Sequence, residues 1–218
     1  MKALERYKLK LDTFLEAQEL QSKVEVFFNH FHKFDIYQHT IEVLEELNLH
    51  KIKYALDQST YERCKMGILL HDIGRVIPAD DVFDFCEAFG YIATSCEKKA
   101  PGIMHQICSR YLAESIFNIK DDEVLEAIEC HTTLKAEPSL IAKIVHLSDK
   151  TSWKEKEVQP LVKRLREACD LDEALFIYQK HIYDGRLDMN CYHPWSYAAY
   201  LILKERVEVR LICEKTVK

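Results

Sequence analysis

Two adjacent residues at the end of an apolar segment, His71 and Asp72 in the fragment LLHDIG, are the strongest chemical signal in this sequence. A carboxylate at the inner end of an apolar helix is costly unless a cation compensates its charge. A metal ion would supply that charge, and imidazole and carboxylate groups are both common metal ligands. A lone His-Asp pair also fits an ordinary hydrogen-bonded pair in a core, so it does not establish a metal site.

Other histidines and a second aspartate strengthen the metal interpretation. They stand where apolar helical stretches meet polar ends, so their side chains could converge from different helices: His39, His105, His131 and Asp149. Together with His71 and Asp72 they make four imidazoles and two carboxylates. This donor set suits Fe, Mn, Co or Zn better than calcium.

The segments that would position these residues all have a helical pattern. The chain has only five Gly and five Pro among 218 residues, and strand-type alternation is absent. We therefore predict an all-α protein. Its expected helices cover residues 4–15, 20–28, 36–47, 59–73, 80–89, 105–117, 121–131, 139–152, 158–168, 171–183 and 194–213.

Several helix starts carry recognisable caps. Ser59, with a glutamate three residues later, has the pattern of a capping box. Asp121 or Asp122 would cap the helix that ends at His131, and Ser139 the helix that carries Asp149. Pro194 stands at an early position of the last helix, where proline is tolerated.

Composition excludes several classes of function. A net charge of −6 argues against a nucleic-acid-binding surface, which needs an excess of Lys and Arg. No stretch approaches the roughly 20 apolar residues of a membrane span, and the charged start MKALERYKLK is unlike a signal peptide. The eight cysteines form no CxxC pair, so we expect reduced thiols in a cytoplasmic protein.

The ordered set H…HD…H…H…D resembles the HD superfamily of metal-dependent phosphohydrolases. Within that superfamily, residues 36–151 resemble the symmetrical diadenosine tetraphosphate hydrolases of the YqeK type. The matching fragments are GILLHDIGRVIP, PGIMHQICSRYLAESIFNIKDDEVLEAIECHTT and SLIAKIVHLSDK. The resemblance implies an HD-domain helical bundle over residues 1–218. Residues 36–152 would form its metal-binding core, with residues 1–35 and 153–218 as flanking helices packed on it.

The resemblance also implies two divalent metal ions, with iron as the first choice and Mn, Mg, Co or Zn as alternatives. His39, His71, Asp72 and Asp149 would hold one ion. Asp72 would bridge to a second ion, which also binds His105 and His131 and keeps positions open for water and a phosphate oxygen. A metal-bound hydroxide would then attack phosphorus.

Arg75 replaces the usual Lys of the family's HDxxK motif, and we place it with Asp72 in the catalytic site. We expect Arg75, Thr132, Thr133 and Lys150 to contact phosphates, although surface or capping roles are the alternative for each. Three other positions depart from the family: the few residues before His39 lack the usual Arg, Leu134 replaces a Gly, and Ser148 replaces an Ala. These departures do not remove any metal ligand, but they put the identity of the substrate in question.

The leading functional hypothesis is hydrolysis of a nucleotide polyphosphate such as diadenosine tetraphosphate, to ADP. The same class includes a phosphatase or phosphodiesterase acting on another nucleotide. A different class is an HD-type di-iron oxygenase, and a third is a degenerate domain that only binds. The expected partner is a small-molecule nucleotide, without nucleic acid or membrane; a homodimer is left open.

Overall fold

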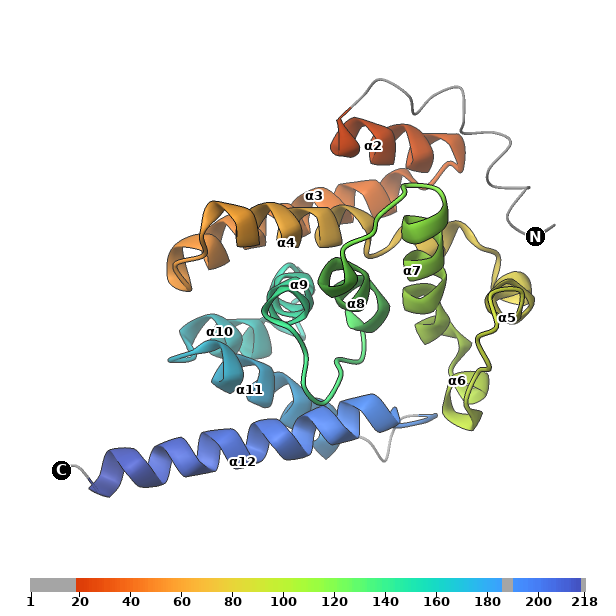
Figure 1. Cartoon of the computed structure of the whole chain (residues 1–218). Helices are drawn as coiled ribbons and strands as arrows, with labels where there is room; N and C mark the ends of the chain where they lie inside the picture. Colours follow the sequence, from red (N-terminus) through yellow and green to blue (C-terminus); the bar gives the residue numbers. More distant parts are fainter. Residues whose placement is uncertain (1–18, 186–189, 217–218) are drawn as a thin grey trace.

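The computed structural model of the chain describes residues 19–185 and 190–216 (Figure 1). Every regular element in these ranges is a helix, so the predicted all-α class is confirmed. The α-helices are α2 (Leu20–His30), α3 (Phe34–Lys53), α4 (Gln58–Leu70), α5 (Val82–Glu87), α6 (Ser95–Lys99), α7 (His105–Ser115), α8 (Asp122–Cys130), α9 (Leu140–Thr151), α10 (Gln159–Glu167), α11 (Leu171–Asp184) and α12 (Pro194–Thr216). Short 3₁₀ turns cover Ile73–Val76, Ala79–Asp81 and Pro101–Met104. The helix expected over residues 4–15 lies outside the described residues.

Helix α9 lies at the centre of the bundle. It packs against α3, α4 and α8 on one side and against α10 and α11 on the other. Residues 144–151 are all buried, including the polar side chains of the helix's last two turns. In Figure 1, α3 and α4 run alongside each other above α9, and α12 runs along the opposite edge beside α11. The central helix therefore carries Asp149 into the interior.

Two clusters of buried apolar side chains stabilise the bundle. The larger cluster joins α2 to α9 and includes Phe27, Ile68 and Val145. The smaller one joins α9 to the last three helices and includes Leu147 and Leu203. Burial of apolar surface contributes about 25 cal/mol per Å². Helix α2 and helices α10 to α12 thus pack on the central bundle through these two clusters.

Two of the predicted helix caps are confirmed and one is wrong. The side chain of Asp121 accepts hydrogen bonds at the start of α8, and Ser139 Oγ accepts one from the amide of Ala142. Helix α4 is capped by Asp57, whose carboxylate accepts from Thr60 N at 2.7 Å, and not by Ser59. Asp57 has the extended backbone of an N-cap, whereas Ser59 already lies in the first turn.

The expectation of reduced thiols is wrong for one pair of cysteines. Cys96 in α6 and Cys191, in the segment before α12, form a disulfide with their Cα atoms 5.4 Å apart. This separation lies within the range that a disulfide spans. Four of the free cysteines are buried, as apolar side chains are.

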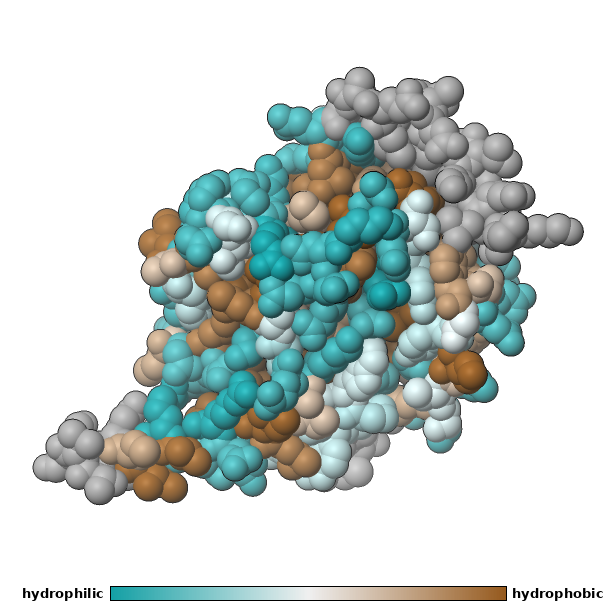
Figure 2. All heavy atoms as spheres, in the orientation of Figure 1, coloured by the Kyte–Doolittle hydropathy of each residue, from teal (hydrophilic) through white to brown (hydrophobic). Residues whose placement is uncertain are grey.

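The described helices include none that combines the length and the apolar character needed to cross a membrane. Figure 2 shows a largely hydrophilic face across the middle of the molecule, with apolar side chains gathered in smaller patches. One patch lies over the far end of α12, where Val209 and Ile212 are exposed.

A glycine permits a close backbone contact between the turn after Asp72 and α7. Gly74, in the 3₁₀ turn after Asp72, donates its amide hydrogen to Ser109 Oγ at 2.8 Å. A Cβ atom at this position would lie 2.3 Å from the carbonyl oxygen of His105 and 2.5 Å from Ser109 N. Those atoms belong to the backbone of α7, so they cannot move aside without shifting the helix. Gly74 therefore fixes how closely Asp72 approaches His105.

We predict that Gly74→Ala lowers the free energy of unfolding by about 3 kcal/mol, because the added methyl group overpacks the contact with α7. Denaturant unfolding measures this change. Gly102→Ala is the matched control, since a Cβ there meets nothing within 4 Å; its effect should stay within about 0.5 kcal/mol. Equal stability of the two variants would contradict this account of the α7 contact.

Candidate metal centre

Five helices bring the six predicted metal ligands to one end of the bundle. His71 and Asp72 form a turn directly after α4, because that helix ends at Leu70. The other four lie on four further helices or at their ends: His39 on α3, His105 at the start of α7, His131 at the end of α8 and Asp149 on α9.

The ligand atoms form two groups that share Asp72. One group contains His39, His71 and Asp72, and the other contains Asp72, His105 and His131. Within each group the candidate atoms lie within 4.8 Å of one another. Asp72 Oδ1 lies 3.1 Å from His105 Nε2 and 3.4 Å from His131 Nε2. The two histidine Nε2 atoms are 2.9 Å apart. This arrangement has the form expected of a carboxylate shared by two cation sites.

Asp149 lies at the edge of the first group. Its Oδ1 atom is 3.2 Å from His39 Nε2, and its Oδ2 atom accepts a hydrogen bond from Lys150 Nζ at 2.6 Å. Burial would lower the pKa of Lys150, but the charge of Asp149 raises it above its usual value. The carboxylate thus has a cationic partner of its own. Its role as a ligand of the first ion stays a prediction.

The backbone fixes the orientation of three histidine rings. In each, Nδ1 faces the carbonyl oxygen three residues earlier: His71 with Ile68 at 2.6 Å, His105 with Gly102 at 2.6 Å, and His131 with Ile128 at 2.9 Å. A carbonyl oxygen only accepts, so Nδ1 carries the proton and the lone pair is on Nε2. Metal-binding histidines are commonly held this way.

Two buried atoms at the centre have no hydrogen-bond partner within the described part of the chain. They are His71 Nε2 and Asp72 Oδ1. Asp72 Oδ1 is close to the Nε2 atoms of two imidazoles, but these atoms carry lone pairs when Nδ1 is protonated and do not donate to it. Unsatisfied buried polar atoms of this kind cost about 1–3 kcal/mol each. A bound cation would satisfy both atoms, so the residues fit a metal ion.

The pKa values favour the protonation states that metal binding needs. Burial would raise the pKa of Asp72, but the neighbouring imidazoles of His71 and His105 outweigh it and keep it well below the usual value. Burial lowers the pKa of His71, and it lowers that of His131 to about 3. A charged carboxylate and neutral imidazoles are the forms in which these side chains bind metals.

A charged cavity of about 510 Å³ opens beside this centre. Asp72, Arg75 and Lys150 line it, together with His39 and Asp149. Arg75 Nε lies 2.7 Å from Asp72 Oδ2, and its side chain is 45% exposed. Arg75 therefore reaches from the buried carboxylate toward solvent. Asp35, on the segment that lacks the family's Arg, also lines this cavity.

The two predicted threonines have different surroundings. Thr132 lines the charged cavity, and its Oγ1 lies 3.3 Å from His105 Nε2. Thr133 is buried, and its hydroxyl is 3.2 Å from the side-chain amide of Gln106. Gln106 Oε1 also accepts a hydrogen bond from the backbone amide of Thr132, so the Gln106 side chain binds both threonines of the turn after α8. Sequence reasoning missed Gln106, although its place directly after His105 was a usable signal.

A buried histidine also supports the centre. His146 Nδ1 faces the carbonyl oxygen of His131 at 2.7 Å. Burial lowers the pKa of His146 to about 3, so the neutral ring donates from Nδ1 to that carbonyl. The helical spacing of His146 and Asp149 was visible in the sequence, but the contact with His131 depends on how α9 packs on α8.

Two departures from the family have structural explanations. Leu134 has φ = 63°, the left-handed conformation that favours glycine, and its fully buried side chain packs in the smaller apolar cluster. Ser148 Oγ lies 3.0 Å from Nδ1 of the buried His50. Burial lowers the pKa of His50 to about 4, and this hydrogen bond gives its neutral ring a partner. Both substitutions thus face the core.

We predict that Asp72→Asn loses both metal ions, because the amide removes the negative charge that the two groups share. Elemental analysis of the purified protein measures the metal content. Glu46→Gln removes another buried carboxylate, which pairs with Arg166 away from the site, and should keep its metal. His131→Ala should empty mainly the second site. Full metal content in Asp72→Asn would show that Asp72 does not bridge.

Comparisons with known proteins agree with this geometry. The HD-domain profile matches residues 36–154. An uncharacterised protein from Lactococcus lactis subsp. cremoris, encoded in the pepC 5' region, is 38% identical over 58% of this chain and 65% of its own length. A symmetrical bis(5'-nucleosyl)-tetraphosphatase from Halalkalibacterium halodurans is 28% identical over 52% of this chain and 58% of its own.

The matches thus span about 60% of the curated relatives' length. A crystal structure from Clostridium acetobutylicum, described as a predicted HD superfamily hydrolase involved in NAD metabolism, covers 85% of this chain and 97% of its own. It has a TM-score of 0.74 at 24% identity, which shows a shared fold. With more than half of its residues matched by the family profile and both His/Asp groups in place, this chain belongs to the HD-domain family.

Proposed function

We propose that this protein is a metal-dependent phosphohydrolase that cleaves a dinucleoside polyphosphate, with diadenosine tetraphosphate as the specific substrate and ADP as the product. The single observation that carries the proposal is the shared carboxylate of Asp72, which joins two His/Asp groups at the wall of a charged cavity. A pair of cation sites on one carboxylate suits hydrolysis of a phosphoryl group.

The cations that line the cavity support a polyphosphate substrate. Arg75 stands at the solvent side of Asp72, and Lys150 is buried beside Asp149. Both side chains carry positive charge within a cavity of about 510 Å³. Carboxylates also line the cavity, at Asp35, Asp72, Asp149 and Glu155, so an anionic phosphate chain would depend on bound divalent ions as well as on these two cations.

The relative from Halalkalibacterium halodurans supports the symmetrical version of the reaction. Its name gives a bis(5'-nucleosyl)-tetraphosphatase, and the chain resembles it over 119 residues. At 28% identity the specific substrate stays a proposal. The more general proposal, hydrolysis of a phosphoanhydride or phosphoester bond, is supported by membership of the HD-domain family.

Each side chain has a distinct part in the proposed reaction. His39, His71, Asp72, His105, His131 and Asp149 would hold two divalent ions. When bound, such ions lower the pKa of water and offset charge on phosphoryl oxygens. Arg75 would bind a phosphate oxygen at the solvent side, because a planar guanidinium group donates hydrogen bonds in a geometry that matches phosphate. Lys150 keeps Asp149 charged, and Thr132 offers a hydroxyl group beside His105.

We predict that the metal-loaded protein converts diadenosine tetraphosphate into two ADP molecules. In oxygen-18 water, one of the two ADP molecules should carry a single label, because water and not a protein side chain supplies the attacking oxygen. Chromatography of the products with mass spectrometry measures both results, and the Asp72→Asn protein is the control for contaminating activity.

Other outcomes of this assay would redirect the proposal. AMP and ATP as products would contradict symmetrical cleavage. Absence of turnover with every dinucleoside polyphosphate, together with turnover of a mononucleotide, would point to a phosphatase or phosphodiesterase. Dioxygen consumption and a mixed-valent iron signal would point to the oxygenase alternative instead.

We predict that Arg75→Ala lowers kcat/KM for diadenosine tetraphosphate about 100-fold, the usual effect of removing a donor to developing charge. Its metal content should not change, because the guanidinium binds Asp72 from the solvent side. Arg110→Ala is the control, since Arg110 pairs with Glu114 and Glu129 and lines neither cavity beside the centre. Loss of metal in Arg75→Ala would mean that Arg75 acts by positioning Asp72.

A further inference from the structure

A second cavity, of about 420 Å³, adjoins the charged one. Thr132 and Tyr178 line both cavities, so the two spaces meet at these side chains. The second cavity continues from there between Ile103, Ile182 on α11, and the segment that leads into α12. Its volume is in the range of ligand pockets in proteins, about 300–1,000 Å³.

The two cavities differ in charge. Asp72, Arg75 and Lys150 line the first, whereas the residues that line the second, within ranges 19–185 and 190–216, include no Asp, Glu, Lys or Arg. The second cavity instead presents the rings of Tyr178 and Tyr192, aliphatic side chains, and polar uncharged groups such as Asn190. Such a lining suits a flat neutral ring with polar edges and disfavours a phosphate chain.

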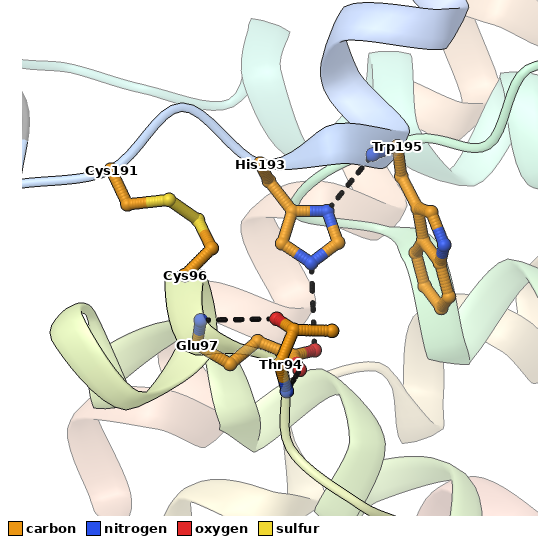
Figure 3. Close-up of a disulfide and its surroundings, with 6 residues drawn as sticks. All are labelled: Thr94, Cys96, Glu97, Cys191, His193 and Trp195. Atoms are coloured by element: carbon orange, nitrogen blue, oxygen red, sulfur yellow. Dashed lines mark hydrogen bonds and ion pairs between the residues drawn. A yellow bond between two sulfur atoms is a disulfide. The ribbon is translucent and has the colours of Figure 1, made fainter.

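Several contacts fasten the outer wall of the second cavity. Figure 3 shows the Cys96–Cys191 disulfide between α6 and the segment before α12, with His193 beside it. His193 Nε2 lies 3.5 Å from Glu97 Oε1. Glu97 is fully buried and closes a capping box with Thr94. The disulfide and this pair hold the wall to α6.

The inner end of the same wall is joined to the metal centre. Ser196 Oγ donates a hydrogen bond to the carbonyl oxygen of Thr133 at 2.7 Å. Thr133 follows Thr132, whose hydroxyl lies 3.3 Å from His105 Nε2. A group in the second cavity would therefore stand next to the metal ligands, with its position set by the wall of residues 190–196.

We infer that the second cavity is the subsite for a nucleoside whose phosphate chain lies in the charged cavity, and that the Cys96–Cys191 disulfide fixes its outer wall. The inference rests on the proposed function for the identity of the nucleotide. It assigns specificity to Ile182, Tyr178 and Tyr192, which are remote from the metal ligands in sequence.

The test measures binding, not turnover. Ile182→Trp places a large side chain in the cavity and should weaken binding of ADP to the metal-loaded protein at least tenfold by calorimetry. Binding of inorganic pyrophosphate, which has no nucleoside, should change less than twofold. Ile177→Trp is the matched control: Ile177 is also half-buried on α11 and packs against the same cluster, but it does not line the cavity.

The outcomes separate this inference from the proposed function. Unchanged ADP affinity in Ile182→Trp, or equal loss for ADP and pyrophosphate, would overturn the subsite, whatever the hydrolysis assay shows. Selective loss of ADP binding in a protein that cleaves no dinucleoside polyphosphate would support the subsite and remove only the proposed reaction. Circular dichroism checks folding, and Ile182→Phe provides a smaller substitution if the tryptophan disrupts it.

A second variant tests the wall. Cys96→Ser breaks the disulfide at the partner that does not line the cavity and leaves Cys191 there as a thiol, so ADP binding should weaken several-fold while pyrophosphate binding and metal content stay the same. Cys169→Ser, at an exposed free cysteine, is the control. Unchanged ADP affinity in Cys96→Ser would overturn the role given to the disulfide.

Discussion

The buried carboxylate of Asp72 is the interaction on which the rest of the site depends. It is 4% exposed, yet its pKa lies well below the usual value, so it is charged in the interior. A buried charge needs compensation from several sides. Arg75 provides it on the side of Oδ2, and a metal ion held between Asp72 and the Nε2 atoms of three imidazoles would provide it on the other. Any element that shifts relative to Asp72 would leave this charge uncompensated.

Backbone geometry, more than side-chain choice, decides how these groups meet. Three imidazoles are turned by carbonyl oxygens of their own helical turns, so each ring has its Nε2 atom aimed at the centre. Gly74 then lets the turn after Asp72 touch the backbone of α7. The helices set the distances, and the carbonyl oxygens set the proton positions. A cation can bind only when the distances between the ligand atoms and the positions of the imidazole protons are both suitable.

The all-α class could be predicted from the sequence, because it depends on local periodicity. The expected grouping of Asp72 with four histidines came from the resemblance to a family, since motifs such as HDIG do not by themselves show which distant residues meet. Other features depend on packing between distant segments. The pairing of Cys96 with Cys191 spans 95 residues. Ser59 had a cap pattern, but Asp57 is the residue with the required backbone. Leu134 and Ser148 are departures from the family whose partners became visible only in the fold.

The two cavities differ in the charge of their lining residues, and this difference also depends on how distant helices pack. Charged groups gather where α3, α9 and the turn after α4 meet, and there Asp72 pairs with Arg75 and Asp149 with Lys150. Beyond Thr132 the lining comes from α11, the turn that holds Ile103, and residues 190–196, and the α11 residues Tyr178 and Ile182 also belong to the smaller apolar cluster. Among the described residues, this lining presents tyrosine and isoleucine side chains and no acidic or basic group. The helices added after the metal-binding core thus provide a neutral surface next to a charged one, which is the pattern a nucleotide presents.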